Sequence, residues 1–83
     1  MKVKPKLYGA EWCPKTSGFR NYFQNEWIDF EYFDIESNAK AEQEVKDMND
    51  GKIKFPMVVV GNFKLKNPSI PELNKALKAN DLL

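Results

Sequence analysis

Apolar residues recur at three- and four-residue spacing in the first third of the chain, which is the pattern of an amphipathic helix. This helix is expected to begin at Pro14, because proline suits the first helical turn, where its missing N–H needs no partner. Its apolar stripe consists of Phe19, Tyr22, Phe23 and Trp27. The pattern therefore predicts a helix that packs one side against a core.

Two further helices are predicted from apolar stripes and from the residues at their ends. The first covers about residues 38–49, with Ser37 as its cap and Gly51 at the left-handed position that ends many helices. Its apolar side holds Ala41, Val45 and Met48. The last helix follows Ser69 and Glu72, which match the S-x-x-E capping box. Its buried stripe is predicted to hold Ile70, Leu73, Ala76 and Leu77.

Four strands are predicted beside these helices. Residues 4–8 form a short strand, and the aromatic-rich residues 30–35 (FEYFDI) are expected to form a strand buried on both faces. Residues 57–60 and 63–66 flank a Gly61-Asn62 turn and should pair as an antiparallel hairpin. The order is β-α-β-α-β-β-α, and the first crossover implies parallel strands. We predict a thioredoxin-like α/β fold, with a four-stranded mixed sheet flanked by three helices; other α/β packings of this order stay open.

The composition limits the chemistry that such a domain can carry. The 83 residues suit a single domain over 1–83, and a net charge of +1 makes neither nucleic acid nor a membrane an expected partner. The chain has no His, which excludes an imidazole base and a His-containing zinc site. Its single Cys excludes an internal disulfide and a four-Cys metal site.

No segment of the sequence predicts export or membrane insertion. The first residues, MKVKPKLY, contain no apolar run long enough for a signal peptide, and nowhere do 18 apolar residues follow one another. The cysteine content fits a reducing compartment. The expected protein is soluble, cytoplasmic and monomeric.

Cys13 is the candidate for chemistry, because it lies between a predicted strand and the helix that begins at Pro14. Its sulfur is expected at a helix N-terminus, where unpaired N–H groups favour the thiolate. Lys15 adds a cation, and the Thr16 hydroxyl can turn back to donate a hydrogen bond to the sulfur, whereas Glu11 disfavours the anion. A thiol whose pKa falls from about 8.5 to about 6 gains roughly thirtyfold in thiolate at neutral pH. The alternative is that Cys13 is a small, partly buried hydrophobic residue.

Trp12 and the Phe55-Pro56-Met57 segment are the other candidates for a site. Beside Cys13, Trp12 is expected either to wall a substrate groove or simply to pack. A proline that opens a buried strand gives up one ladder hydrogen bond. A cis peptide bond between Phe55 and Pro56 is one reason for such a proline, and an ordinary strand start is the other.

Several segments together resemble glutaredoxins. Residues 7–14 (LYGAEWCP) resemble the active-site strand and turn of that family. The likeness covers nearly the whole chain and is strongest to the mycoredoxin-like branch in residues 30–35, 49–52, 55–60, 67–69 and 72–73. The resemblance implies that Cys13 is the nucleophile, that Pro56 is cis and faces it, and that Met57 contacts the substrate backbone.

The sequence departs from the glutaredoxin pattern at three places. Thr16 stands where the dithiol form C-P-x-C has its second cysteine, so the motif is C-P-K-T and an intramolecular dithiol route is closed. Ala10 stands where glutathione-binding members usually have Lys, and residues 66–69 replace their Gly-Gly-x-Asp segment. The C-G-F-S motif of iron–sulfur-carrying members is absent. The resemblance therefore leaves the identity of the small thiol open.

The resulting hypothesis is a monothiol glutaredoxin-like thiol–disulfide oxidoreductase that serves electron transport and cell redox homeostasis. Cys13 attacks a mixed disulfide and is released by a second thiol, while Thr16 and the amides after Cys13 stabilise the thiolate. The expected partners are a low-molecular-weight thiol, glutathione or an analogue, and a disulfide-containing client protein; no cofactor or metal is expected. The groove is predicted to consist of Trp12, Pro14, Lys15, Phe55, Pro56 and Met57.

Two alternatives to this hypothesis stay open. A binding or redox-sensing module of the same fold could keep the groove without catalysis. A dimer could instead hold an iron–sulfur cluster through one Cys13 per chain and two small thiols.

Overall fold

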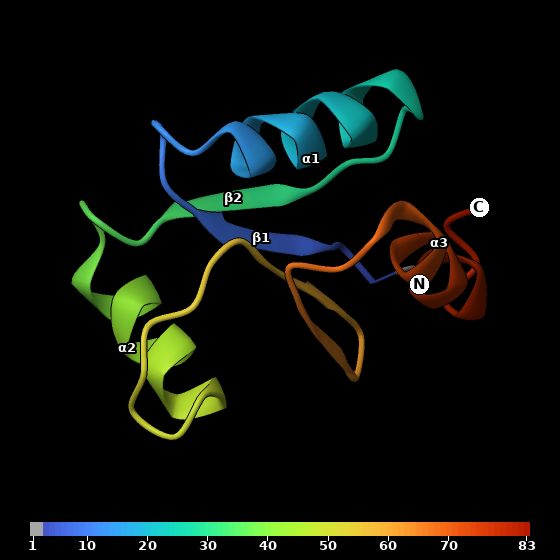
Figure 1. The fold of residues 1–83 in the computed structure, drawn as a ribbon. Coiled ribbons are helices and arrows are strands. Elements are labelled where there is room, and N and C mark those ends of the chain that lie inside the picture. The colour runs from blue at the N-terminus through green and yellow to red at the C-terminus, as the bar shows by residue number, and fades with distance from the viewer. Residues whose placement is uncertain (1–2) are drawn as a thin grey trace.

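The computed structural model describes residues 3–83 (Figure 1). Met1 and Lys2, at the start of the segment in which no signal peptide is predicted, lie outside the described residues. Within residues 3–83 the elements follow the predicted order, and none of the helices combines the length and apolar character needed to cross a membrane. The elements are β1 (Lys6–Gly9), α1 (Pro14–Asn25), β2 (Glu31–Asp34), α2 (Ala39–Met48), β3 (Met57–Val60), β4 (Phe63–Lys66) and α3 (Ile70–Ala79).

The strands form one mixed sheet in the order β2-β1-β3-β4. β1 pairs parallel with β2, where Leu7 lies opposite Tyr32, and antiparallel with β3, where Leu7 lies opposite Val58. β3 and β4 form the predicted antiparallel hairpin. β1 begins at Lys6, two residues after the predicted start, since Pro5 has no N–H to give to the ladder. The predicted α/β architecture with a four-stranded mixed sheet is confirmed.

The second strand does not have the environment that its aromatic residues predicted. β2 is an edge strand, and it is shorter than the predicted 30–35. Glu31 is exposed and the other three residues of β2 are only half-buried. The prediction of a strand buried on both faces is therefore wrong. β2 lies at the edge of the sheet, where β1 is its only neighbouring strand.

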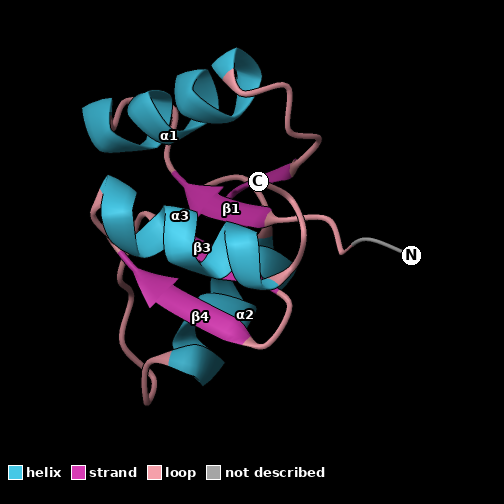
Figure 2. Cartoon of the chain, turned by 90° about the vertical axis from the view of Figure 1, so that its right-hand side faces the viewer, coloured by secondary structure: helices cyan, strands magenta, loops and turns pink. Residues whose placement is uncertain are grey.

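The sheet separates two apolar clusters. α2 covers one face and α1 lies across the other (Figure 1), while α3 packs beside β3 and β4 (Figure 2). The Tyr22 hydroxyl donates a hydrogen bond to the Asn74 side chain and so ties α1 to α3. The α2 cluster consists of Tyr8, Ile35, Ala41, Val45 and Met57. The larger cluster under α1 and α3 consists of Leu7, Phe19, Phe23, Ile28, Val58, Val60, Leu73, Ala76 and Leu77.

Trp27 was expected in the buried stripe of the first helix, and the structure corrects this. α1 ends at Asn25, and Trp27 takes a left-handed φ of 56° with 94% of its surface exposed. The Ile28 N–H bonds to the Phe23 carbonyl at 2.9 Å, and the Trp27 N–H bonds to the Gln24 carbonyl at 3.2 Å. These two bonds are a Schellman motif, which turns the chain so that Ile28, and not Trp27, enters the core.

The caps of the other two helices agree with the sequence only in part. Asn38, not Ser37, caps α2, because the helix begins one residue later and the Asn38 side chain accepts the Ala41 N–H at 3.1 Å. The capping box of Ser69 and Glu72 is present as predicted. Gly51 has the predicted left-handed conformation and follows a left-handed Asp50. Two residues of the predicted apolar stripes are less buried than expected, since Met48 is half-buried and Ile70 is 40% exposed.

Gly18, in the middle of α1, provides a test of helix propensity. A methyl group added there meets nothing within 4 Å. We expect Gly18→Ala to raise the free energy of unfolding by about 0.5–1 kcal/mol, because glycine loses more backbone entropy in a helix than alanine does. Urea unfolding followed by circular dichroism measures this change. A decrease would show that position 18 needs the space of a glycine.

Candidate active site

Cys13 is the last residue before α1 and closes the tight turn that follows β1. Its N–H donates to the Ala10 carbonyl at 3.1 Å, and its own carbonyl accepts the Ser17 N–H at 3.1 Å, the first bond of the helix. Pro14 occupies the first helical turn, as predicted. The sulfur therefore lies at the N-terminus of α1.

The Cys13 side chain is covered but lies near the surface. Only 8% of the residue is exposed. It forms no disulfide. The thiol is thus sheltered by its immediate neighbours.

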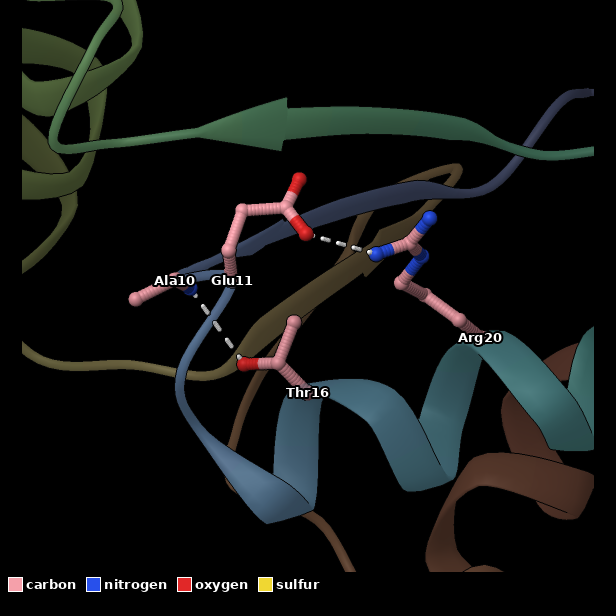
Figure 3. A network of polar contacts seen from close by, with 4 residues as sticks. All are labelled: Ala10, Glu11, Thr16 and Arg20. Carbon is pink, nitrogen blue, oxygen red and sulfur yellow. Dashed lines mark hydrogen bonds and ion pairs between the residues drawn. The ribbon is translucent and has the colours of Figure 1, made fainter.

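Thr16 is fully buried beneath this turn and connects it to the helix. Its Oγ1 accepts the Ala10 N–H at 3.4 Å, as Figure 3 shows, and its hydroxyl faces the Cys13 sulfur. A hydroxyl can accept one hydrogen bond and donate another. Thr16 can therefore accept a hydrogen bond from the Ala10 N–H and donate one to the thiolate.

The surroundings lower the pKa of the Cys13 thiol. Burial acts in the opposite direction and is the largest single influence. It is outweighed by hydrogen bonding from the Thr16 side chain, by the N–H groups of Thr16 and Lys15, and by the charge of Lys15. Cys13 forms no side-chain capping hydrogen bond with the helix, and the partial positive charge of a helix N-terminus favours an anion at this place. The net effect favours the thiolate.

Gly9 is a residue of this site that sequence reasoning missed. A Cβ at position 9 would lie 2.4 Å from Thr16 Oγ1 and 2.5 Å from Thr16 Cγ2. The strand must therefore carry a glycine at this point for the buried threonine to fit. The only signal in the sequence was a glycine at the predicted end of a strand.

Trp12 brings the cysteine turn and the proline segment together. Its ring is 65% exposed and packs edge-on against the Phe55 ring, with centroids 5.7 Å apart. The Trp12 Nε1–H donates to Glu36 Oε1 at 2.9 Å. Glu36, which lies between β2 and α2, is a second residue that sequence reasoning missed, because nothing in its local pattern links it to Trp12.

The Phe55–Pro56 peptide bond is cis, as the resemblance implied, and the alternative of an ordinary strand start is excluded. The Pro56 carbonyl accepts the Asn67 N–H at 2.8 Å, which joins this segment to the loop before α3. Pro56 is buried, and the Met57 side chain is fully buried beside Asn49. Of Met57, therefore, only the backbone could meet a substrate.

Two open hollows meet at Asn67, whose φ of 43° is left-handed. The larger, of about 510 Å³, lies between α1 and the start of α3, and the smaller, of about 310 Å³, lies beside Pro56. Lys15 and Glu72 line the larger hollow, whereas Lys54 and Lys66 line the smaller one. Three of these four charged residues are cationic. Within residues 3–83, no cluster of three or more His, Cys, Asp or Glu could hold a metal ion.

Known proteins resemble this chain in sequence and in fold. The sequence profile of the glutaredoxin family matches residues 6–63. No curated protein matches the sequence.

Solved structures of similar fold cover nearly the whole chain. The thioredoxin-like protein BC3987 is 22% identical, with a TM-score of 0.79 over 89% of this chain and 100% of that chain. A mutant of the same protein is 21% identical, with a TM-score of 0.82 over 90% and 95%. A glutaredoxin from Archaeoglobus fulgidus is 19% identical, with a TM-score of 0.76 over 92% and 87%. At these identities the likeness concerns the fold, and it confirms the thioredoxin-like class.

Proposed function

Because this chain belongs to the glutaredoxin family, whose members are thiol–disulfide oxidoreductases, we propose that it is a monothiol member acting through a mixed disulfide on Cys13. The observation that carries the proposal is the position of the thiol. Cys13 lies at the N-terminus of α1 beside a buried Thr16 hydroxyl, in surroundings that lower its pKa. Thiolates, not thiols, attack disulfides, so this position supports a nucleophile.

The reaction has two exchange steps. In the first, the Cys13 thiolate attacks one sulfur of a mixed disulfide between a client protein and a small thiol, forms a disulfide with the small thiol, and expels the client thiolate, which takes a proton from water. In the second, the thiolate of another small-thiol molecule attacks the small-thiol sulfur of that adduct. Cys13 leaves as thiolate, and the two small thiols depart as a disulfide. The net reaction converts the mixed disulfide and one small thiol into the free client thiol and the disulfide of the small thiol.

Each predicted site residue has a place in these steps. Thr16 and the first amides of α1 stabilise Cys13 both as attacking thiolate and as leaving group. Trp12 and Phe55 form one wall beside the thiol, with Pro14 and Lys15 at the start of the helix. The backbone at Pro56 and Met57 provides the groups that a bound disulfide can contact.

The charges of the site support an anionic small thiol as the partner. Lys15, Lys54 and Lys66 line the two hollows on either side of Asn67, whereas Glu72 is the only acidic residue that lines them. We therefore take glutathione or an analogue with free carboxylates as the small thiol, and a disulfide-containing protein as the client. The cationic lining favours such carboxylates by simple attraction.

The pH dependence of Cys13 alkylation tests the proposal directly. The wild-type midpoint should lie below the value of an ordinary thiol, and Thr16→Val should raise it by about one unit, because a hydrogen bond to a charged sulfur is lost. The rate of iodoacetamide reaction between pH 5 and 10 gives both values, since the chain has only one cysteine.

Thr16→Ser is the matched control, because it keeps the hydroxyl and should hold the wild-type midpoint. If wild type titrates near pH 8.5, as a free thiol does, the oxidoreductase proposal is wrong and the binding module becomes the better hypothesis. A wild-type midpoint in Thr16→Val would show that the Thr16 hydroxyl does not stabilise the Cys13 thiolate.

A further inference from the structure

Glu11 presents a problem for a thiolate at Cys13. Two trans peptide bonds separate the residues, so their Cα atoms are no more than about 7.6 Å apart. Glu11 is a central residue of the turn that the Cys13 N–H closes onto the Ala10 carbonyl. A free carboxylate here disfavours the thiolate, because a like charge at short range raises a thiol pKa.

Arg20 draws the Glu11 carboxylate away from the sulfur. Arg20 Nη1 lies 3.1 Å from Glu11 Oε2, although the two residues are nine positions apart in the chain. In Figure 3 the Glu11 side chain points away from the first turn of α1 and toward Arg20. The carboxylate is thus both displaced and paired.

Arg20 is itself held by a second contact. Its guanidinium carbon lies 4.6 Å from the centre of the Tyr32 ring on β2. A guanidinium over an aromatic face is attracted by the ring, and stacking restricts its orientation. Arg20 therefore has a contact with β2 in addition to its ion pair with Glu11.

Tyr32 also shows that Glu11 and Cys13 act within one electrostatic environment. Burial raises the pKa of Tyr32, and among the charges Glu11 contributes most to the same direction, followed by Asp34. Arg20 acts against them, and Cys13 is close enough to contribute too. The charges that act on Tyr32 thus come from the cysteine turn (Glu11), from α1 (Arg20) and from β2 (Asp34), whereas the charge that acts directly on the thiol is that of Lys15. Lys54 and Lys66 line the hollow beside Pro56.

We propose that Arg20 is a positioning residue of this enzyme: by holding Glu11 against β2, it keeps the carboxylate from opposing the Cys13 thiolate. This inference rests on the proposed function and adds to it a residue outside the C-P-K-T motif. Arg20 touches neither the sulfur nor a substrate. It acts through Glu11, and its effect is on the fraction of Cys13 that is ionised.

The alternative is that the pair merely braces the turn. The side chains of Arg20 and Glu11 are 35% and 63% exposed, and exposed ion pairs contribute little to stability. If bracing were the role, removing either partner would loosen the turn, and both single substitutions would shift the alkylation midpoint of Cys13 in one direction. The double variant would shift it in that direction as well. If charge is the role, the two single substitutions act in opposite directions and the double variant cancels them.

The experiment is the alkylation midpoint of Cys13 in four proteins: wild type, Arg20→Gln, Glu11→Gln and the double variant. We expect Arg20→Gln to raise the midpoint by about half a unit, a roughly threefold loss of thiolate below it, as one uncompensated surface charge would. Glu11→Gln should lower the midpoint, because it removes the carboxylate that disfavours the thiolate. The double variant should return to the wild-type value, and Arg20→Lys, which keeps the charge, should stay near it.

The α2 ion pair of Lys46 and Glu42, whose charged atoms lie 3.6 Å apart, supplies the control. Lys46→Gln removes an exposed cation in the same way and should leave the midpoint unchanged. The proposal would be overturned if Arg20→Gln had the wild-type midpoint, or if the double variant had the same raised midpoint as Arg20→Gln. Neither result bears on turnover by wild type, so the proposed function is tested separately.

Discussion

Cys13→Ser should lose all reductase activity and keep the fold. With the sole thiol replaced, no side chain of this chain can form a mixed disulfide, so reduction of a glutathionylated peptide should fall to the uncatalysed rate. Serine is a preferred N-cap residue, whereas Cys13 makes no side-chain capping bond. The variant should therefore be as stable as wild type, or more stable by up to about 1 kcal/mol.

A coupled assay of disulfide reduction measures the activity, and urea unfolding measures the stability. Intact mass after incubation with oxidised small thiols completes the test: wild type should gain one adduct and the serine variant none. Turnover at the wild-type rate by Cys13→Ser would contradict the mechanism. A wild-type protein that forms the adduct without turnover would leave Cys13 as a redox sensor.

Gly9→Ala should have the largest effect on stability and should also disturb the thiol. The added methyl would lie 2.4 Å from Thr16 Oγ1, closer than nonbonded atoms approach, and Thr16 is fully buried. Overpacking of this kind typically costs about 1–3 kcal/mol. If Thr16 moves to relieve the clash, its hydroxyl leaves the sulfur and the alkylation midpoint rises. Urea unfolding and the alkylation profile measure the two effects.

Thr16→Ala, combined with Gly9→Ala in a double variant, separates the clash with Thr16 from the other effects of a methyl group at position 9. It removes both Oγ1 and Cγ2, which leaves Cβ as the nearest Thr16 side-chain atom, at 3.0 Å. The double variant should therefore lose less stability than the sum of the two single variants, by about 1 kcal/mol. Gly18→Ala supplies the matched glycine control, since a methyl group at that position meets no neighbour. Strict additivity would show that Gly9 and Thr16 do not constrain each other.

The sequence predicted the features of this fold that depend on local pattern. Period-2 and period-3.6 spacing gave the order of the elements, the S-x-x-E motif gave the start of α3, and Cys13 before Pro14 gave a thiol at a helix N-terminus. Where a local signal competed with packing, the prediction failed. Trp27 continued the apolar spacing of α1, but the helix closes two residues before it and Ile28 takes the buried place.

The parts of the site that sequence reasoning missed are contacts across the fold. Glu36 lies 24 positions from Trp12, and Arg20 lies nine positions from Glu11. No periodic pattern marks such pairs, because they depend on how β2 and α1 lie beside the cysteine turn. Glu11 shows the difference well: from the sequence it is a charge that opposes the thiolate, whereas in the fold it is paired with Arg20.

The two tryptophans stand in very different surroundings, which gives the molecule an intrinsic optical reporter. The indole of Trp27 is almost entirely in water beyond the far end of α1, whereas that of Trp12 is fixed by Glu36 and Phe55 next to the cysteine. An indole that reaches solvent emits nearly as it does in an unfolded chain, so it contributes a constant background. With Trp27 changed to Phe, all remaining indole fluorescence comes from Trp12 beside Cys13, and binding or reaction at this turn can be followed in real time without a label.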